Sequence, residues 1–121
     1  MVSRFGRFLR KLRIDNNLIL KDMADILNVS SSMLSAVENG KKSVPLEWEG
    51  IIIDNYSLSE SEKEELHYSI VESIKQVRID VDSSDHSRAN VAVSFARNFE
   101  DLNEEKLKRI FDILESENKG D

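Results

Sequence analysis

Apolar residues recur through most of the chain at spacings of three and four residues, with polar and charged residues between them. This is the period at which one face of an α-helix returns to the same side. Five groups share this spacing: Phe5, Phe8, Leu9 and Leu12; Leu20, Met23, Ala24 and Leu27; Met33 or Leu34 with Val37; Leu46, Trp48, Ile51, Ile52 and Tyr56; and Leu66, Ile70, Ile74 and Val77. The pattern therefore predicts five helices in succession.

Residues suited to helix ends separate these groups. Ser3 and Ser30 precede the first and third groups, where a hydroxyl can accept a hydrogen bond from a backbone N–H. Asn28 and Gly40 follow the second and third groups, where helices often end in left-handed backbone. Pro45 suits the first turn of the fourth helix, because its missing N–H is not needed there.

The period changes near residue 77. Val77, Ile79 and Val81 alternate with charged residues, as in a short strand or an extended linker. A lone strand is not stable, so its simplest partner would be the same strand of a second subunit. Helical spacing then resumes in two more groups, with Asn103 as a cap between them: Ala92, Phe95, Ala96, Phe99 and Leu102; and Leu107, Ile110, Phe111 and Leu114. The expected fold is all-α, with at most one short strand.

Composition narrows the class of protein. With 40% hydrophobic residues, one proline and four glycines, the chain is expected to fold and to be largely helical. It has no cysteine, which excludes disulfides and thiolate metal sites. No run approaches about 18 consecutive apolar residues, and arginines stand where a signal peptide needs an apolar stretch. We therefore expect a soluble, cytoplasmic protein that does not enter a membrane.

Charge divides the chain into a basic and an acidic part. Residues 1–42 contain eight Lys or Arg and four Asp or Glu, a net charge of +4, whereas the remainder contains nine and nineteen, a net charge of -10. Any phosphate contact is therefore expected in the first part. We place the division at Ser59, with a basic head over residues 1–58 and an acidic helical extension over residues 59–121. Residues 78–87 form a second, softer joint.

The second and third predicted helices are short and are joined by a turn at residues 27–29. With the small Ala24 where the two helices must approach, this is what a helix-turn-helix requires. From Phe8 to Tyr56 the sequence resembles the lambda-repressor-like, or XRE-type, helix-turn-helix regulators. The resemblance is carried by Leu12-Arg13, Met23-Ala24, Val29-Ser30, Leu34-Ser35 and Glu38-Asn39-Gly40-Lys41. It implies a lambda-repressor-like five-helix DNA-binding head, here followed by a C-terminal helical extension for dimerisation.

The resemblance also assigns roles to particular residues. It implies an ion pair between Arg13 and Glu38 that orients the third helix. It implies phosphate contacts from Asn39, from the amides near Gly40, and from two lysines. The residues implied in DNA binding are Ser30 at the backbone, Ser31, Ser32, Ser35 and Ala36 in the major groove, and Asn39, Lys41 and Lys42 at phosphate.

Two features depart from the family pattern. Leu20 stands where the family often has a glutamine that binds phosphate, and the third helix offers no Arg, Gln or Asn for bidentate base contacts. We therefore expect modest base readout, helped by DNA shape or water. Alternatively, Arg4 and Arg7 compensate along the backbone or in a groove.

A head of this size makes few contacts, which predicts a two-fold dimer on an inverted repeat in double-stranded DNA. The expected dimer interface is formed by Val77, Ile79, Val81, Phe95, Phe99 and Phe111. By analogy with proteins of similar sequence, the predicted function is repression of a mobile-element or prophage promoter. Two alternatives stay open: an antitoxin, or an interaction adaptor without base recognition. In either case the acidic segment from Ser59 onward would bind a protein such as a toxin or an antirepressor.

The sequence offers little for catalysis or metal binding. His67 and His86 are the only histidines, and no metal-binding spacing surrounds them. Asp80, Asp82 and Asp85 lack the glycine and closing glutamate of a calcium loop, so we interpret them as loop acids and helix caps. There is no phosphate-binding glycine-rich loop and no arrangement resembling a catalytic triad. We predict no enzyme activity, no cofactor and no metal.

Overall fold

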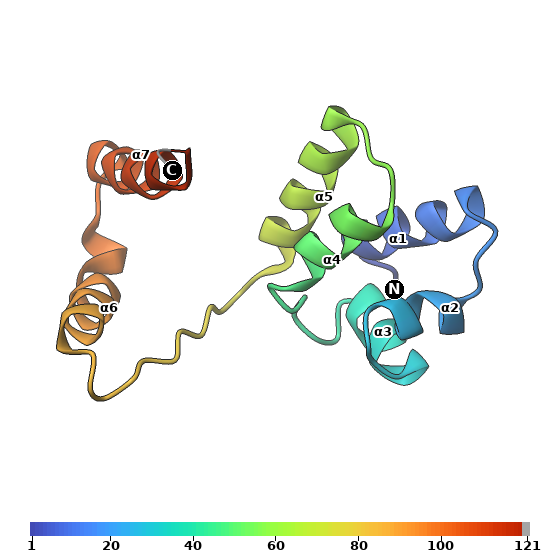
Figure 1. The fold of residues 1–121 in the computed structure, drawn as a ribbon, viewed down its shortest axis with the longest axis horizontal. Helices are drawn as coiled ribbons and strands as arrows, with labels where there is room; N and C mark the ends of the chain where they lie inside the picture. Colours follow the sequence, from blue (N-terminus) through green and yellow to red (C-terminus); the bar gives the residue numbers. More distant parts are fainter. Residues whose placement is uncertain (120–121) are drawn as a thin grey trace. The chain divides into compact units, whose positions relative to one another are not determined.

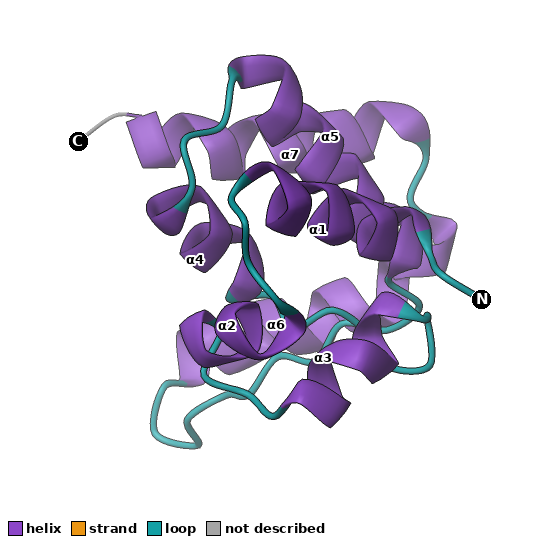
Figure 2. Ribbon diagram, turned by 90° about the vertical axis from the view of Figure 1, so that its right-hand side faces the viewer, coloured by secondary structure: helices purple, strands orange, loops and turns teal. Residues whose placement is uncertain are grey.

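The computed structural model describes residues 1–119, and these residues form helices and loops without a strand (Figures 1 and 2). The chain divides into two compact units, Met1–Val77 and Arg78–Asp121. The first unit contains α1 (Arg4–Asp15), α2 (Leu20–Ile26), α3 (Ser31–Glu38), α4 (Trp48–Asn55) and α5 (Glu60–Ser73). The second contains α6 (His86–Asn98), the 3₁₀ turn η1 (Phe99–Asp101) and α7 (Glu104–Lys119). The predicted all-α fold is confirmed.

Two predicted helix ends are wrong. α4 begins at Trp48, because residues 45–48 first form a turn in which the Trp48 N–H donates to the Pro45 carbonyl at 3.1 Å. Leu46 therefore lies outside the helix and is 58% exposed instead of buried. α5 ends at Ser73, and Ile74 already has extended backbone. Val77 is consequently not on the helix and is exposed.

Three successive helices end in the same way. Asn17, Asn28 and Gly40 have positive φ angles of 56°, 58° and 73°. In each case the next N–H reaches back to the third carbonyl from the helix end: Leu18 to Arg13 at 2.8 Å, Val29 to Ala24 at 2.9 Å, and Lys41 to Ala36 at 2.9 Å. This is the Schellman arrangement, which stops a helix sharply and fixes the direction of the following chain. The predicted helix ends at Asn28 and Gly40 are confirmed.

All five helices of the first unit contribute to one hydrophobic core. Its members are Phe5, Leu9, Leu12, Met23, Ala24, Leu27, Leu34, Val37, Val44, Trp48, Ile52, Tyr56, Leu66 and Ile70. The rings of Phe5 and Trp48 are both fully buried in it, with their centroids 6.3 Å apart. α5 packs on α1 and α4 through Leu66 and Ile70. The compact unit extends to Val77, whereas the division drawn on charge falls before α5.

The second unit is a pair of helices without a buried core. Asp85 caps α6 by accepting a hydrogen bond from the Arg88 N–H at 3.0 Å, and Asn103 caps α7 by accepting one from the Lys106 N–H at 2.8 Å. No side chain described between residues 78 and 116 is buried. Residues 77–82 have no regular secondary structure in the described chain, so the predicted strand is not formed within it. A single chain supplies no edge with which it could pair.

Candidate nucleic-acid interface

α2 and α3 form a tight two-helix corner. The left-handed Asn28 ends α2, and Ser30 starts α3 by accepting a hydrogen bond from the Met33 N–H at 3.1 Å. Ala24 is 1% exposed, so its small side chain lies inside the corner. Leu34 and Val37 turn one face of α3 into the core. The opposite face of α3 is left for solvent or for a ligand.

That opposite face lines a shallow depression of about 400 Å³. α3 contributes four of the predicted contact residues, namely Ser31, Ser32, Ser35 and Ala36. Leu20 from α2 and, beyond α3, Asn39 and Lys41 complete the lining. The structure thus brings most of the predicted reading residues together and adds Leu20, which the sequence placed on the apolar face of the second helix, where the family often has a phosphate-binding glutamine. Ser30 does not line the depression.

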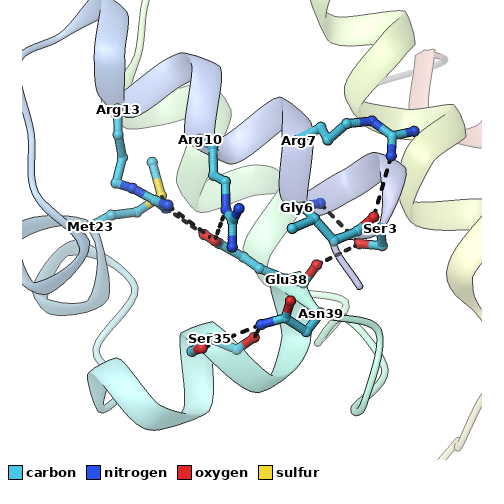
Figure 3. Close-up of polar contacts among 10 residues, drawn as sticks. Ser3, Gly6, Arg7, Arg10, Arg13, Met23, Ser35, Glu38 and Asn39 are labelled. Atoms are coloured by element: carbon cyan, nitrogen blue, oxygen red, sulfur yellow. Dashed lines mark hydrogen bonds and ion pairs between the residues drawn. The ribbon is translucent and has the colours of Figure 1, made fainter.

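The end of α3 is fastened to α1 through the Glu38 side chain (Figure 3). Glu38 is 1% exposed, and Arg13 donates hydrogen bonds to both of its carboxylate oxygens, with Arg13 Nη2 at 3.0 Å from Oε1. Arg10 approaches the same carboxylate at 3.5 Å, and Arg13 also donates to the Met23 sulfur at 3.4 Å. Buried pairs of this kind add little net stability but are costly to break. The pair therefore acts mainly on the orientation of α3 relative to α1 and α2.

The Glu38 carbonyl is held as well, at the start of α1. The N–H and the hydroxyl of Ser3 both donate to this oxygen, at 2.9 and 3.0 Å, and the same hydroxyl accepts from the Gly6 N–H at 3.0 Å (Figure 3). A Cβ on Gly6 would lie 2.2 Å from the Glu38 oxygen, so only glycine permits this approach. Sequence reasoning found Ser3 only as a helix cap. A glycine within a helical pattern was the available signal for close packing.

The backbone N–H groups near Gly40 donate hydrogen bonds to carbonyls in the last turn of α3. The Gly40 N–H donates to the Val37 carbonyl at 3.0 Å, and the Lys41 N–H donates to the last turn of α3. The Asn39 side-chain amide also turns back, donating to the Ser35 carbonyl at 2.8 Å. These two backbone amides therefore have partners within the chain, and their contact with phosphate stays a prediction. Exposed positive charge at this end comes from the side chains of Lys41 and Lys42.

Comparison with known protein families agrees with this geometry. A family model described as a helix-turn-helix domain matches residues 4–66, just over half of the chain. The chain belongs to this helix-turn-helix family. The family is of the Cro/C1/XRE type, and its domain indicates DNA-binding transcriptional regulation. No curated protein and no solved structure gives a significant match. The matched residues run from α1 into α5, which agrees with the contribution of α5 to the core.

The two N-terminal arginines of the helix-turn-helix domain have different surroundings. Arg4 donates to both carboxylate oxygens of Glu65, at 2.8 and 2.7 Å, and to Glu72 at 3.1 Å. These hydrogen bonds raise the pKa of Arg4, and the Glu65 pKa is lowered by its hydrogen bond from Arg4. The charge of Arg4 is thus compensated by α5, which sequence reasoning did not anticipate. Arg7 is exposed and donates to the Val2 carbonyl at 3.3 Å.

The predicted dimer residues all lie on exposed surface outside the core of the domain. Val77, Ile79 and Val81 follow α5 in a segment without regular secondary structure. The rings of Phe95 and Phe99 lie 5.3 Å apart between centroids and are tilted by 51°, where α6 runs into η1, and Phe111 on α7 is 60% exposed. The structure therefore brings one aromatic pair together and leaves the remaining residues uncovered.

The remaining polar candidates have local partners. The His67 ring nitrogen Nδ1 lies 3.0 Å from a Glu49 carboxylate oxygen, which links α5 to α4. Asp82 accepts hydrogen bonds from Ser84, which lower the pKa of Asp82. Within the described part of the chain no group of three or more His, Cys, Asp or Glu side chains could hold a metal ion. No described helix has the length and apolar character needed to span a bilayer.

Proposed function

We propose that this protein is a sequence-specific DNA-binding repressor that acts as a dimer on an inverted repeat. One observation carries the proposal. The outer face of α3 gathers small hydroxyl and methyl side chains in one depression, while Glu38 at the end of the helix is fixed to α1 from two sides. A rigidly held helix with an unpartnered outer face suits insertion into the major groove. Lys41 and Lys42 would meet phosphate beside it.

The dimer is proposed from the second unit. Its helices have large apolar side chains on the surface: Val91 is 71% exposed, Phe99 52%, Phe111 60% and Leu114 60%. Isolated helices are marginal in water, and packing supplies most of their stability. A second copy would cover these faces and join two heads about 34 Å apart, one DNA turn. Sedimentation of the full chain tests this step, because a folded protein with the mass of one chain contradicts it.

The repressor role follows from occupancy. A dimer bound across a promoter blocks polymerase, and a signal that separates the two heads releases it. The mobile-element or prophage context rests on the resemblance, and the cytoplasmic location, which rests on the sequence composition, is also part of the proposal.

A second candidate function uses the same exposed surface. The apolar faces of α6 and α7, within the acidic segment from Ser59 onward, would also fit a partner protein, as in an antitoxin or an interaction adaptor. An adaptor without base recognition binds DNA weakly and without sequence preference. The adaptor therefore differs from the repressor in whether the protein alone selects a DNA sequence, whereas an antitoxin would also repress its operon and differs in whether the segment from Ser59 onward needs another protein.

Selection against a random duplex library tests the proposal directly. The wild-type chain is compared with Lys41→Ala/Lys42→Ala and with the control Lys63→Ala/Lys75→Ala, which removes two lysines on and just after α5. We expect an enriched inverted repeat. The slope of log affinity against log salt concentration should be smaller in magnitude than that of wild type by about two for each subunit of the Lys41→Ala/Lys42→Ala variant, because each lost phosphate contact contributes about 0.9 to the slope. No enrichment from folded protein, or equal slopes in both variants, contradicts the proposal.

A further inference from the structure

We infer that the depression between α2 and α3 recognises the methyl group of thymine, and that Leu20 determines this specificity. The inference rests on the proposed function and names the base that the outer face of α3 selects. It assigns Leu20 a role that its place at the start of α2 does not by itself suggest.

Leu20 is held in place rather than free in solvent. It is partly buried, packs against the hydrophobic core and lines the depression. Its position is therefore fixed by the fold, and the area it offers to a ligand is apolar. Ala36 on α3 adds a methyl group to the same lining. Exposing these apolar side chains to water is unfavourable in free energy, so covering them with an apolar group of a ligand is favourable.

The polar part of the lining consists of short side chains. The hydroxyls of Ser31 and Ser32 make no hydrogen bond within the described chain, and the Ser35 hydroxyl has one long contact, 3.4 Å from the Asn39 amide. A hydroxyl can donate to or accept from any base edge, so these serines do not discriminate strongly. Discrimination between bases must therefore come from an apolar group of the base that Leu20 and Ala36 can contact.

Thymine is the base that fits this combination. In the major groove it presents a C5 methyl group beside the O4 acceptor, while adenine, guanine and unmodified cytosine present no methyl group. The methyl can lie against Leu20 and Ala36, and a serine hydroxyl can donate to O4. Lys41 at the rim can instead contact guanine, so a guanine-selective site is the alternative that the experiment must separate.

The inference predicts a measurable loss when one methyl group is removed from the DNA. Replacing a contacted thymine by deoxyuridine leaves every hydrogen-bonding group of the base unchanged. Burial of one methyl corresponds to about a fourfold change in affinity. A symmetric operator substituted in both half-sites is therefore expected to bind about fifteenfold more weakly.

A thermodynamic cycle between Leu20 and the thymine methyl tests the contact itself. The selected operator is resynthesised with deoxyuridine at one thymine position at a time, and its affinity is measured for wild type, Leu20→Ala, Leu20→Met and Ile14→Ala. Ile14 is a matched control because it is an apolar residue of α1, 75% exposed, and does not line the depression. The readout is the ratio of two affinities for the same protein, so a partly unfolded sample does not bias it. Leu20→Asn, which keeps the branching and length of the side chain but is polar, replaces Leu20→Ala if the latter does not fold.

The expected result is a thymine whose replacement weakens binding about fourfold in wild type, Leu20→Met and Ile14→Ala, but not in Leu20→Ala. An operator that binds equally with thymine and deoxyuridine at every position overturns the inference and leaves the proposed function standing. So does an equal loss in wild type and Leu20→Ala. If no operator is selected at all, both the proposed function and the inference are overturned.

Discussion

Replacing Gly6 by alanine tests whether the close approach of α1 to the end of α3 is required. Gly6 is the third residue of α1, and its hydrogen on Cα faces the Glu38 carbonyl. The added methyl would lie 2.2 Å from that oxygen, 2.9 Å from its carbon and 2.9 Å from a Val2 side-chain atom. Two of these three neighbours are backbone atoms that cannot rotate away. The helices must therefore separate at this point.

The chain provides a matched control for the effect of alanine on helix stability. Gly50 is the third residue of α4, and a Cβ there would have no neighbour within 4 Å. Alanine in place of glycine within a helix adds about 0.5 to 1 kcal/mol of stability through backbone entropy. Gly50→Ala should gain this amount. Gly6→Ala has the same entropic gain but costs about 1 to 3 kcal/mol in overpacking, and it strains the two hydrogen bonds from Ser3 to Glu38.

We therefore expect Gly6→Ala to unfold at a midpoint about 5 to 20 °C below that of Gly50→Ala, since 1 kcal/mol corresponds to about 4 to 8 °C in a domain of this size. Trp48 reports this transition, because it is the single tryptophan of the chain and is 1% exposed. Operator affinity of the folded Gly6→Ala protein should also fall, since the end of α3 moves. A Gly6→Ala protein as stable as Gly50→Ala would refute the reasoning.

Three further changes have defined outcomes. Arg13→Met should reduce the free energy of unfolding by about 3 to 5 kcal/mol in urea titrations, because Glu38 loses its main buried partner. The double variant Arg13→Met/Glu38→Leu should recover most of this loss. Equal losses of stability in the single and the double variant would contradict the prediction. Arg4 lowers the pKa of Glu65 below its usual 4.5, so the stabilisation from this pair is complete above pH 4.5 and is lost as the pH falls through the lowered pKa. The free energy of unfolding should therefore fall less steeply with decreasing pH in Glu65→Gln than in wild type. Equal slopes in the two proteins would contradict this prediction. The buried Tyr56 hydroxyl has no hydrogen-bond partner in the described chain, and burial raises its pKa. Tyr56→Phe should thus be as stable as wild type or up to about 1 kcal/mol more stable in thermal unfolding, whereas a loss of that size would indicate a bonded hydroxyl.

The helices of the first unit could be predicted because their signals are local. Each apolar face follows from a spacing of three or four residues, and the ends at Asn28 and Gly40 follow from the conformations that Asn and Gly accept. The start of α4 could not be predicted in this way. Pro45 fits both a first helical turn and the preceding turn, and the choice depends on how Trp48 reaches the core.

The arrangement around the candidate site depended on contacts between residues far apart in sequence. The resemblance supplied the Arg13–Glu38 pair, but the double hydrogen bond from Ser3 to the Glu38 carbonyl joins residues 35 positions apart. The pairing of Arg4 with α5 spans an even longer stretch, 61 residues. Sequence periodicity places Ser3 and Arg4 near the start of a helix and contains no information about which residues far along the chain they contact. The depression beside Leu20 likewise exists only once α2 and α3 are packed.

The second unit shows most clearly what periodicity leaves open. Phe111 belongs to a group with the same helical spacing as the group that contains the buried Leu9, yet it is 60% exposed. The difference lies in the number of helices available. Five helices cover one another in the first unit, whereas two helices cannot enclose a core. An apolar stripe therefore marks a surface that needs a partner without saying whether the same chain supplies it. In the proposed dimer the second copy would supply that surface, so the association that buries Phe111 would also be the one that sets two α3 helices at the spacing of the DNA groove.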